Sequence, residues 1–119
     1  MQAIPEAQLL RLEDLREKVN MALEALIQRE IDNGAGEVAK LSGEILLSGG
    51  KRLRPLMGIF CYEVAGGEDL DEIMDLALAF ELIHTATLIH DDINDAVKLR
   101  RGVTTLHERI GQPKAIIAG

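Results

Sequence analysis

Hydrophobic residues recur every three or four positions near the start of the chain, between Glu6 and Asp32. The set comprises Leu9, Leu12, Leu15, Val19, Leu23 and Leu26. On a helix these side chains share one face, and the residues between them are mostly good helix formers. The pattern therefore predicts an amphipathic helix. It should end at Asn33-Gly34, because glycine readily adopts the left-handed conformation that closes a helix.

Three further helices are predicted, over Glu37–Leu47, Pro55–Ala65 and Leu70–Asp95. Ser48-Gly49-Gly50 ends the first of them, and a proline in the first turn suits the start of the second. Asp69, with Glu72 three residues later, resembles a capping box ahead of the last one. No alternating stretch rich in β-branched residues is present, so strands are not expected. The sequence predicts an all-α architecture.

The chain has 119 residues, 47% of them hydrophobic, which is enough for one domain, 1–119, with a core. Its apolar end, Ala115–Gly119, is more typical of a helix that continues than of a finished protein. The formal net charge of −7 argues against nucleic acid as a partner. The single cysteine, Cys61, lies in an apolar run, so we expect a small core residue and no internal disulfide.

Neither a secretory leader nor a run of about 18 apolar residues is apparent in the sequence. We therefore expect a soluble, cytoplasmic protein without stable membrane insertion.

Candidate chemistry begins with three aspartates at the end of the fourth predicted helix. Asp91 and Asp95 fall within about 40° of each other on one helix face, whereas Asp92 points about 100° away. Like charges one turn apart near a helix carboxyl end repel each other unless a cation neutralises them. Paired carboxylates suit Mg²⁺ that is also bound by phosphate oxygens. A solvated acidic helix end remains the alternative interpretation of these residues.

Two groups of basic residues complement the acidic one. Arg100-Arg101-Gly102 follows Asp95 after four intervening residues, and Lys51, Arg52 and Arg54 surround the start of the third predicted helix. Arginine forks and the free amides of a helix start both favour phosphate oxygens. Taken singly, either group is more typical of solvated surface. Together with the aspartates they indicate two diphosphate pockets and a metal ion.

Two motifs resemble those of the trans-isoprenyl (polyprenyl) diphosphate synthase family. Residues 49–55 read Gly-Gly-Lys-Arg-Leu-Arg-Pro, and residues 88–95 read Leu-Ile-His-Asp-Asp-Ile-Asn-Asp before the paired arginines. The resemblance implies the amino-terminal half of an isoprenoid synthase helical bundle. It also implies Mg²⁺-dependent condensation of isopentenyl diphosphate with an allylic diphosphate, in a homodimer. In that reaction the allylic diphosphate ionises to a carbocation, which the isopentenyl double bond attacks.

The resemblance also assigns roles to individual residues. Asp91 and Asp95 would hold Mg²⁺, and Arg100 would contact the allylic diphosphate. The isopentenyl diphosphate site would comprise Lys51, Arg54, His84 and Arg101. Helix geometry independently places His84 on the same stripe as Asp91. No nucleophilic side chain is implied as catalytic.

Two other histidines receive no catalytic role. His90 faces away from the acidic pair and is interpreted as structural, and His107 as a surface or helix-cap residue.

The sequence departs from the family pattern after Asp95, where no further aspartate occurs and the second aspartate-rich motif is therefore missing. Three explanations stay open: a fragment of a longer enzyme, a truncated product, or one subunit of a heteromer. We expect this chain alone to be inactive. A non-catalytic or partner-dependent subunit, or an acidic helical interaction module, are the alternative functions.

Product length is also implied by the resemblance. Bulky residues at the fourth and fifth positions before the first aspartate block the growing prenyl tail in the family, and here Thr87 and Ala86 occupy them. We therefore expect a product longer than fifteen carbons, with Ile83 as the next side chain that would close the passage.

Overall fold

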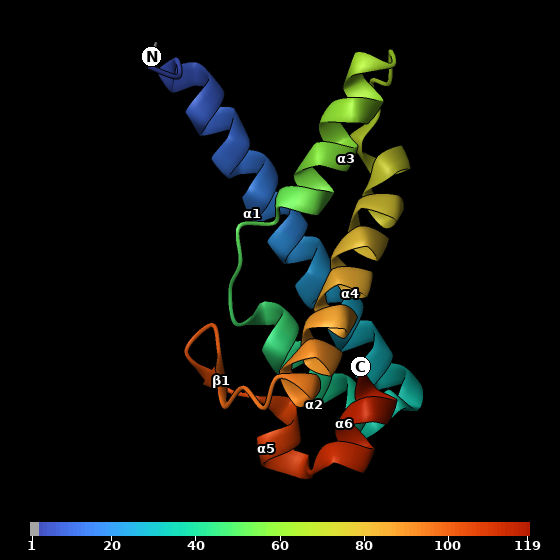
Figure 1. Cartoon of the computed structure of the whole chain (residues 1–119). Helices are drawn as coiled ribbons and strands as arrows, with labels where there is room; N and C mark the ends of the chain where they lie inside the picture. The colour runs from blue at the N-terminus through green and yellow to red at the C-terminus, as the bar shows by residue number, and fades with distance from the viewer. Residues whose placement is uncertain (1–2) are drawn as a thin grey trace.

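The computed structural model describes residues 3–119 and is mostly helical (Figure 1). The longer helices are α1 (Glu6–Glu30), α2 (Gly36–Leu47), α3 (Leu53–Val64) and α4 (Leu70–Asn94). Two short helices, α5 (Leu106–Ile110) and α6 (Gln112–Ala118), follow a small hairpin. The all-α prediction is thus confirmed, and the ends of the four longer helices lie within two residues of those expected.

Helix α1 ends at Glu30, and the turn that follows contains the predicted glycine with a left-handed backbone. A π-helical turn, Ile31–Ala35, continues from α1, and Gly34 within it has φ 97°. The chain reverses there, so that α2 returns alongside the last part of α1.

Helix α3 begins two residues before Pro55, because Arg52 takes a left-handed conformation (φ 56°) and forms its N-cap. The carbonyl of Arg52 accepts from the amide of Leu56 at 3.1 Å, which closes the first turn. Pro55 lies inside this turn, where its missing N–H leaves no helical bond unmade. The basic residues 51–54 therefore straddle the junction of a loop and a helix.

Only half of the predicted capping box forms at the start of α4. The Asp69 side chain accepts from the amide of Asp71 at 3.0 Å. Glu72 does not reach back to Asp69 and instead accepts from the hydroxyl of Tyr62 at 2.5 Å, while that hydroxyl accepts from the amide of Asp69 at 3.3 Å. Tyr62 thus takes the place of the expected glutamate and joins the end of α3 to the start of α4.

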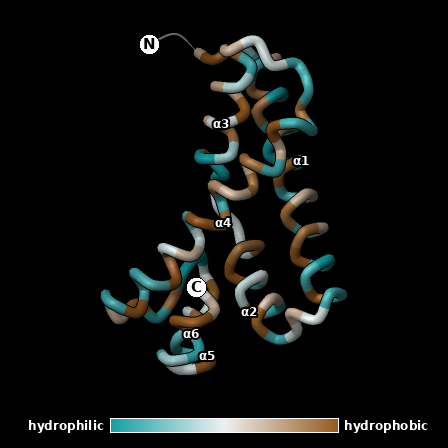
Figure 2. The backbone as a smooth tube through the Cα atoms, turned by 90° about the vertical axis from the view of Figure 1, so that its right-hand side faces the viewer, coloured by the Kyte–Doolittle hydropathy of each residue, from teal (hydrophilic) through white to brown (hydrophobic). Residues whose placement is uncertain are grey.

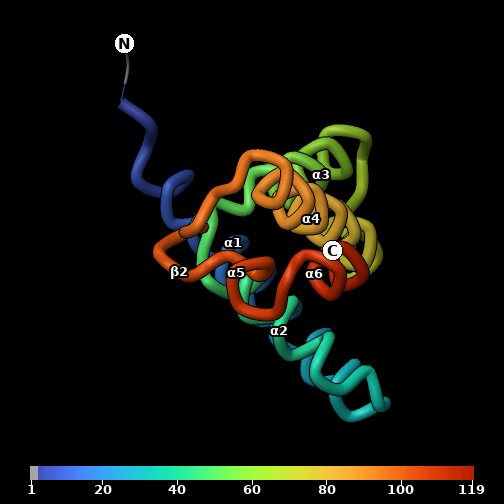
Figure 3. Tube along the Cα trace, turned by 60° about the horizontal axis from the view of Figure 1, so that its bottom comes forward, coloured from blue at the N-terminus to red at the C-terminus, as the bar shows by residue number. Residues whose placement is uncertain are grey.

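Helix α4 is the central helix, lying beside α3 and also contacting α1, α2 and α6 (Figures 1 and 3). One buried cluster joins α1, α2, α3 and α4: Leu15, Val19, Leu23, Leu46, Leu56, Ile59, Ile73, Ala77 and Leu78. A second, smaller cluster lies where α5 and α6 pack on α2 and α4: Ile45, Ile89, Leu106 and Ala115. The second cluster holds the chain after α4 against the end of the bundle.

A hairpin of two very short strands, β1 (Leu99–Arg100) and β2 (Val103–Thr104), corrects the expectation of no strands. Its two-residue turn, Arg101-Gly102, has positive φ at both positions (55° and 76°). Turns of this kind match the twist of paired strands. The glycine was the available sequence signal, but the strands are too short for an alternating pattern.

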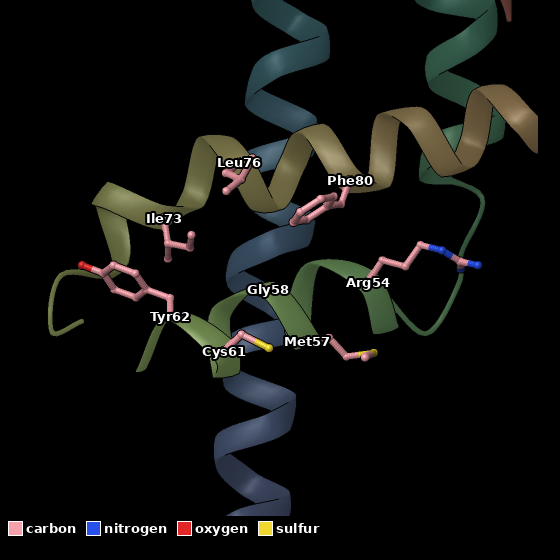
Figure 4. A pocket seen from close by; sticks show the side chains of 8 residues that line it. All are labelled: Arg54, Met57, Gly58, Cys61, Tyr62, Ile73, Leu76 and Phe80. Atoms are coloured by element: carbon pink, nitrogen blue, oxygen red, sulfur yellow. The ribbon is translucent and has the colours of Figure 1, made fainter. Parts of the chain in front are cut away.

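Cys61 is exposed, so its expected place in the core is wrong. Figure 4 shows it on α3 beside Met57, at the edge of an apolar groove between α3 and α4. Helix α3 turns Leu56 and Ile59 inward, and its apolar run contains more residues than that face can bury.

Exposed apolar side chains are common elsewhere too, including Leu76 and Phe80 of α4. Apolar segments accordingly recur along the whole backbone in Figure 2. The radius of gyration, 15.9 Å, exceeds the value of about 13.5 Å expected for a compact domain of this length. The described bundle is therefore more open than a typical isolated domain.

Among the described helices, α4 alone is long and apolar enough to cross a membrane by length and composition. The central helix of a soluble protein passes the same test, and α4 buries the charged residues Glu81 and Asp92. We therefore interpret α4 as a core helix.

Candidate active site

Three segments that are distant in the sequence meet at the carboxyl-terminal half of α4. They are the loop 48–52 with the first turn of α3, the hairpin turn at Arg101, and α4 from Glu81 to Asp95. Each of these segments carries residues that the sequence singled out. The fold therefore brings the predicted basic and acidic groups to one region.

Arg54 and His84 are in direct contact, with Arg54 Nη1 3.2 Å from His84 Nε2. Because a guanidinium only donates, Nε2 is assigned as the acceptor, which puts the ring proton on Nδ1. Burial, and then the charge of Arg54, lower the pKa of His84; Arg101 and Arg100 act in the same direction, and only Glu81 opposes them. Burial and the three arginine charges thus disfavour the protonated form of this imidazole.

Arg101 lies across the loop that precedes α3. Its guanidinium packs on Gly50, where an added Cβ would lie 2.9 Å from Nη2, and Nη1 donates to the carbonyl of Ile45 at 3.5 Å. Burial, and then the charge of Arg52, lower the pKa of Arg101. Glycine suits position 50 because its φ of +125° is a backbone conformation that residues with a side chain rarely adopt, and because it leaves room for the guanidinium.

Arg52 lies outside this pocket, which corrects its grouping with Lys51 and Arg54 as a diphosphate-binding residue. It is 3% exposed, and its Nη1 donates to Glu81 Oε1 at 2.7 Å. The left-handed backbone at Arg52 turns its side chain into the bundle, whereas Arg54 stays exposed two residues later. Glu81 was missed by sequence reasoning, and its place three residues before His84 was the only available hint.

Helix geometry alone also gave no role to Asp92. It is 3% exposed and accepts from Arg100 Nε at 3.1 and 3.2 Å, with a further contact from Arg100 Nη2. The hydrogen bond to Asp92 raises the pKa of Arg100 against the effect of burial, and the charges of Asp92, Asp91 and Asp95 act in the same direction. Asp92 therefore anchors Arg100 beside the other two aspartates.

Asp91 and Asp95 are both exposed, and the amide of Asp95 donates to the carbonyl of Asp91 at 2.8 Å, so they remain one helical turn apart. Within residues 3–119 neither carboxylate forms an ion pair closer than 4 Å. No three His, Cys, Asp or Glu side chains in this part of the chain gather into a complete metal site. Two carboxylates with free coordinating oxygens nevertheless suit Mg²⁺, which takes its remaining ligands from phosphate and water.

Of the predicted site residues, Arg54, His84, Arg100, Arg101, Asp91 and Asp95 are brought into this region. Lys51 lies on the same loop and is exposed, but only its backbone carbonyl has a partner, Arg16 Nε at 3.2 Å. Among the described residues, the side chain of Lys51 forms no hydrogen bond or ion pair with the other predicted site residues. Its assignment to isopentenyl diphosphate therefore stays a prediction.

The two remaining histidines differ from each other. His90 Nε2 lies 3.0 Å from the carbonyl of Ile116 and ties α4 to α6, in keeping with a structural residue. Of the two alternatives for His107, a surface or a helix-cap residue, the surface position is wrong, since its side chain is 7% exposed and Nδ1 has no partner among the described residues. It is buried because α5 packs onto the smaller core cluster through the adjacent Leu106.

Comparison with known proteins gives a match to the polyprenyl synthetase family over residues 36–119. The chain belongs to this family, and its fold is that of the isoprenoid synthase helical bundle. The matched region includes both basic groups and the aspartates, so the resemblance seen in the sequence motifs is confirmed.

Two curated relatives match large parts of the chain. A geranylgeranyl pyrophosphate synthase from Geoglobus acetivorans is 40% identical over 108 residues, which are 91% of this chain and 33% of that protein. A short chain isoprenyl diphosphate synthase from Methanocaldococcus jannaschii is 46% identical over 78 residues, which are 66% of this chain and 24% of that protein. The chain thus spans a third or less of the length of these curated relatives.

A solved structure, the geranyltranstransferase from Thermotoga maritima, superposes with a TM-score of 0.78 at 31% sequence identity. The match covers 91% of this chain and 40% of that one. The helical arrangement described above is therefore shared with the amino-terminal part of a larger bundle.

Proposed function

We propose that the protein containing this chain is a prenyltransferase that condenses isopentenyl diphosphate with an allylic diphosphate. The observation that carries the proposal is the convergence of Arg54, His84 and Arg101 next to the acidic end of α4. Family membership and the names of the relatives support it. The expected product is longer than fifteen carbons, in line with relatives named for a geranylgeranyl product.

Two diphosphates must be held in different ways, because only the allylic one leaves. Arg54, His84 and Arg101 offer donors to the isopentenyl diphosphate, which stays attached to its carbon chain. Arg100, oriented by Asp92, offers its remaining N–H groups toward the allylic diphosphate. Charge on the departing group is thus met by donors that are already in place.

Asp91 and Asp95 are the residues that would hold Mg²⁺ on the allylic side. When bound, Mg²⁺ would neutralise negative charge on the diphosphate and so make it a better leaving group. The chain's own contribution is to keep two carboxylates one helical turn apart and, within residues 3–119, without an ion pair closer than 4 Å. Asp92 assists by pairing with Arg100, whose charge would otherwise be available to pair with Asp91 or Asp95.

The proposal also retains the homodimer expected from the resemblance, which the mass of the intact protein in solution would check. The alternative of a non-catalytic subunit has no specific observation in its favour.

Substrate-specific Michaelis constants test the two-pocket assignment. In the complete enzyme, Lys51→Ala and Arg54→Ala should raise the KM for isopentenyl diphosphate by about tenfold or more, because a charge-assisted contact is worth about 1.5–3 kcal/mol. The KM for the allylic substrate should change much less, and Arg100→Ala should show the reverse preference. Lys40→Ala, an exposed lysine on α2, is the matched control. Equal increases of both constants in all three variants would refute the assignment.

A further inference from the structure

Glu81 is a buried acid that the proposed reaction does not use. Its side chain is 2% exposed in the middle of α4, three residues before His84. Oε1 accepts from Arg52 at 2.7 Å and lies 3.8 Å from Arg101 Nη2. A carboxylate that is this deeply buried needs compensating charges, and here two arginines from different loops supply them.

The side-chain N–H groups of Arg52 donate to partners inside the bundle. Nε donates to Asn20 Oδ1 on α1 at 2.8 Å, and Nη2 donates to the carbonyl of Leu46 on α2 at the same distance. With Glu81, these partners tie α1, α2 and α4 to the residue that caps α3. A left-handed backbone at a residue other than glycine is unfavourable and persists only when its surroundings fix it. The contacts of Arg52 therefore set where α3 starts, and with it the position of Arg54.

Arg101 is the second cation that pairs with Glu81. Like Arg52, it has a left-handed backbone, here at the hairpin turn. Its side chain is 16% exposed and lies on Gly50. Arg52 and Arg101 repel each other, and the charge of Glu81 counteracts the effect of this repulsion on the pKa of Arg101. Without Glu81, two partly or fully buried guanidinium groups would lie close together with no anion between them.

We propose that Glu81 is a positioning residue of the isopentenyl diphosphate pocket. Its carboxylate holds Arg101 against the loop 48–52 and, through Arg52, fixes the start of α3 from which Arg54 projects. Glu81 itself does not touch the substrate. This inference rests on the proposed function, because it assigns Glu81 to the pocket formed by Arg54, His84 and Arg101. The allylic side, where Arg100 is held separately by Asp92, does not depend on Glu81.

The test compares Glu81→Gln with Asn20→Ala in the complete enzyme. Both changes remove or weaken one partner of Arg52, but only Glu81→Gln removes the anion next to Arg101. We expect Glu81→Gln to raise the KM for isopentenyl diphosphate by about tenfold, with the allylic KM and kcat within about threefold of wild type. Asn20→Ala should lower the melting temperature and leave both KM values within about twofold. The result could instead be that both variants lower the melting temperature and neither changes one KM more than the other. That would show that Glu81 is only structural.

A second pair of variants covers the case in which Glu81→Gln does not fold, since it leaves buried cations uncompensated. Arg52→Met keeps Glu81 available to Arg101, whereas Arg52→Met combined with Glu81→Gln leaves no buried ion pair but deprives Arg101 of its anion. The double variant should have a KM for isopentenyl diphosphate about tenfold above that of Arg52→Met. Equal values would overturn the inference. A wild-type enzyme without any turnover would instead contradict the proposed function.

Discussion

Asp91 and Asp92, which are neighbours near the end of α4, should respond in opposite ways when each is changed to asparagine. Asp91 and Asp95 repel each other one turn apart at the carboxyl end of a helix. Relief of such a repulsion contributes about 0.2–0.5 kcal/mol, and the helix dipole adds about 0.3–1 kcal/mol at low salt, both reduced by solvent at exposed positions. In the absence of metal, Asp91→Asn should therefore stabilise the protein by about 0.5–1 kcal/mol.

Asp92→Asn should have the opposite effect. Asp92 is buried and accepts a paired contact from Arg100, and a hydrogen bond between charged groups contributes about 1.5–3 kcal/mol. Each kcal/mol of unfolding free energy shifts the melting temperature by about 2–4 °C. The melting temperature should therefore fall by about 3 °C or more for Asp92→Asn and rise by about 1–4 °C for Asp91→Asn.

Asp91→Asn should have the higher melting temperature without ligand, and wild type should have the higher one with magnesium and diphosphate. A ligand at about 100 times its dissociation constant stabilises the folded state by about 2.7 kcal/mol, and a variant without the metal ligand loses most of this gain. The assay is thermal unfolding of the complete protein, once with a chelator and once with Mg²⁺ and inorganic diphosphate. Asp75→Asn, an exposed aspartate elsewhere on α4, is the matched control and should keep the full ligand-induced rise. The reasoning fails if Asp91→Asn destabilises the protein in chelator, or if its ligand-induced rise equals that of wild type.

Three further predictions concern the pocket, the prenyl passage and the fold. The pKa of His84 is lowered below its usual value near 6.5, so protonation favours the unfolded state. The melting temperature should therefore fall more steeply from pH 7 to pH 5 in wild type than in His84→Gln. Parallel curves of melting temperature against pH would contradict this. Ala86 lines a hollow of about 350 Å³ together with Ile83, so Ala86→Phe should shorten the product, and an unchanged product mass would contradict an open passage there. An added Cβ at Gly67 would lie 2.3 Å from the Tyr62 ring. Gly67→Ala should therefore lower the free energy of unfolding by about 1–3 kcal/mol in denaturant titrations, and a change below about 0.5 kcal/mol would show that the ring moves freely.

Much of the fold could be predicted from local signals. The glycine at position 34, the proline at 55 and the cap at Asp69 each act within a few residues, so the ends of α1, α3 and α4 followed from the sequence. The shared face of Asp91 and Asp95 followed from helix geometry alone.

Other features depended on packing between distant segments, which no local pattern records. Arg52 and Arg54 look equivalent in the sequence, but the left-handed backbone at Arg52 sends one side chain to Glu81 and leaves the other near His84. Asp92 has its role only because a hairpin brings Arg100 back to α4. Cys61 and His107 were misplaced because the partition between core and surface is decided by which helices pack on each face.

The most direct test of the proposed prenyltransferase activity is the product made by the complete protein from labelled isopentenyl diphosphate and an allylic diphosphate, measured by mass. The account predicts a Mg²⁺-dependent prenyl diphosphate longer than fifteen carbons, which is lost with Asp91→Ala or Asp95→Ala while helical circular dichroism is retained. No condensation by the intact wild-type protein, or a product of fifteen carbons or fewer, would contradict it.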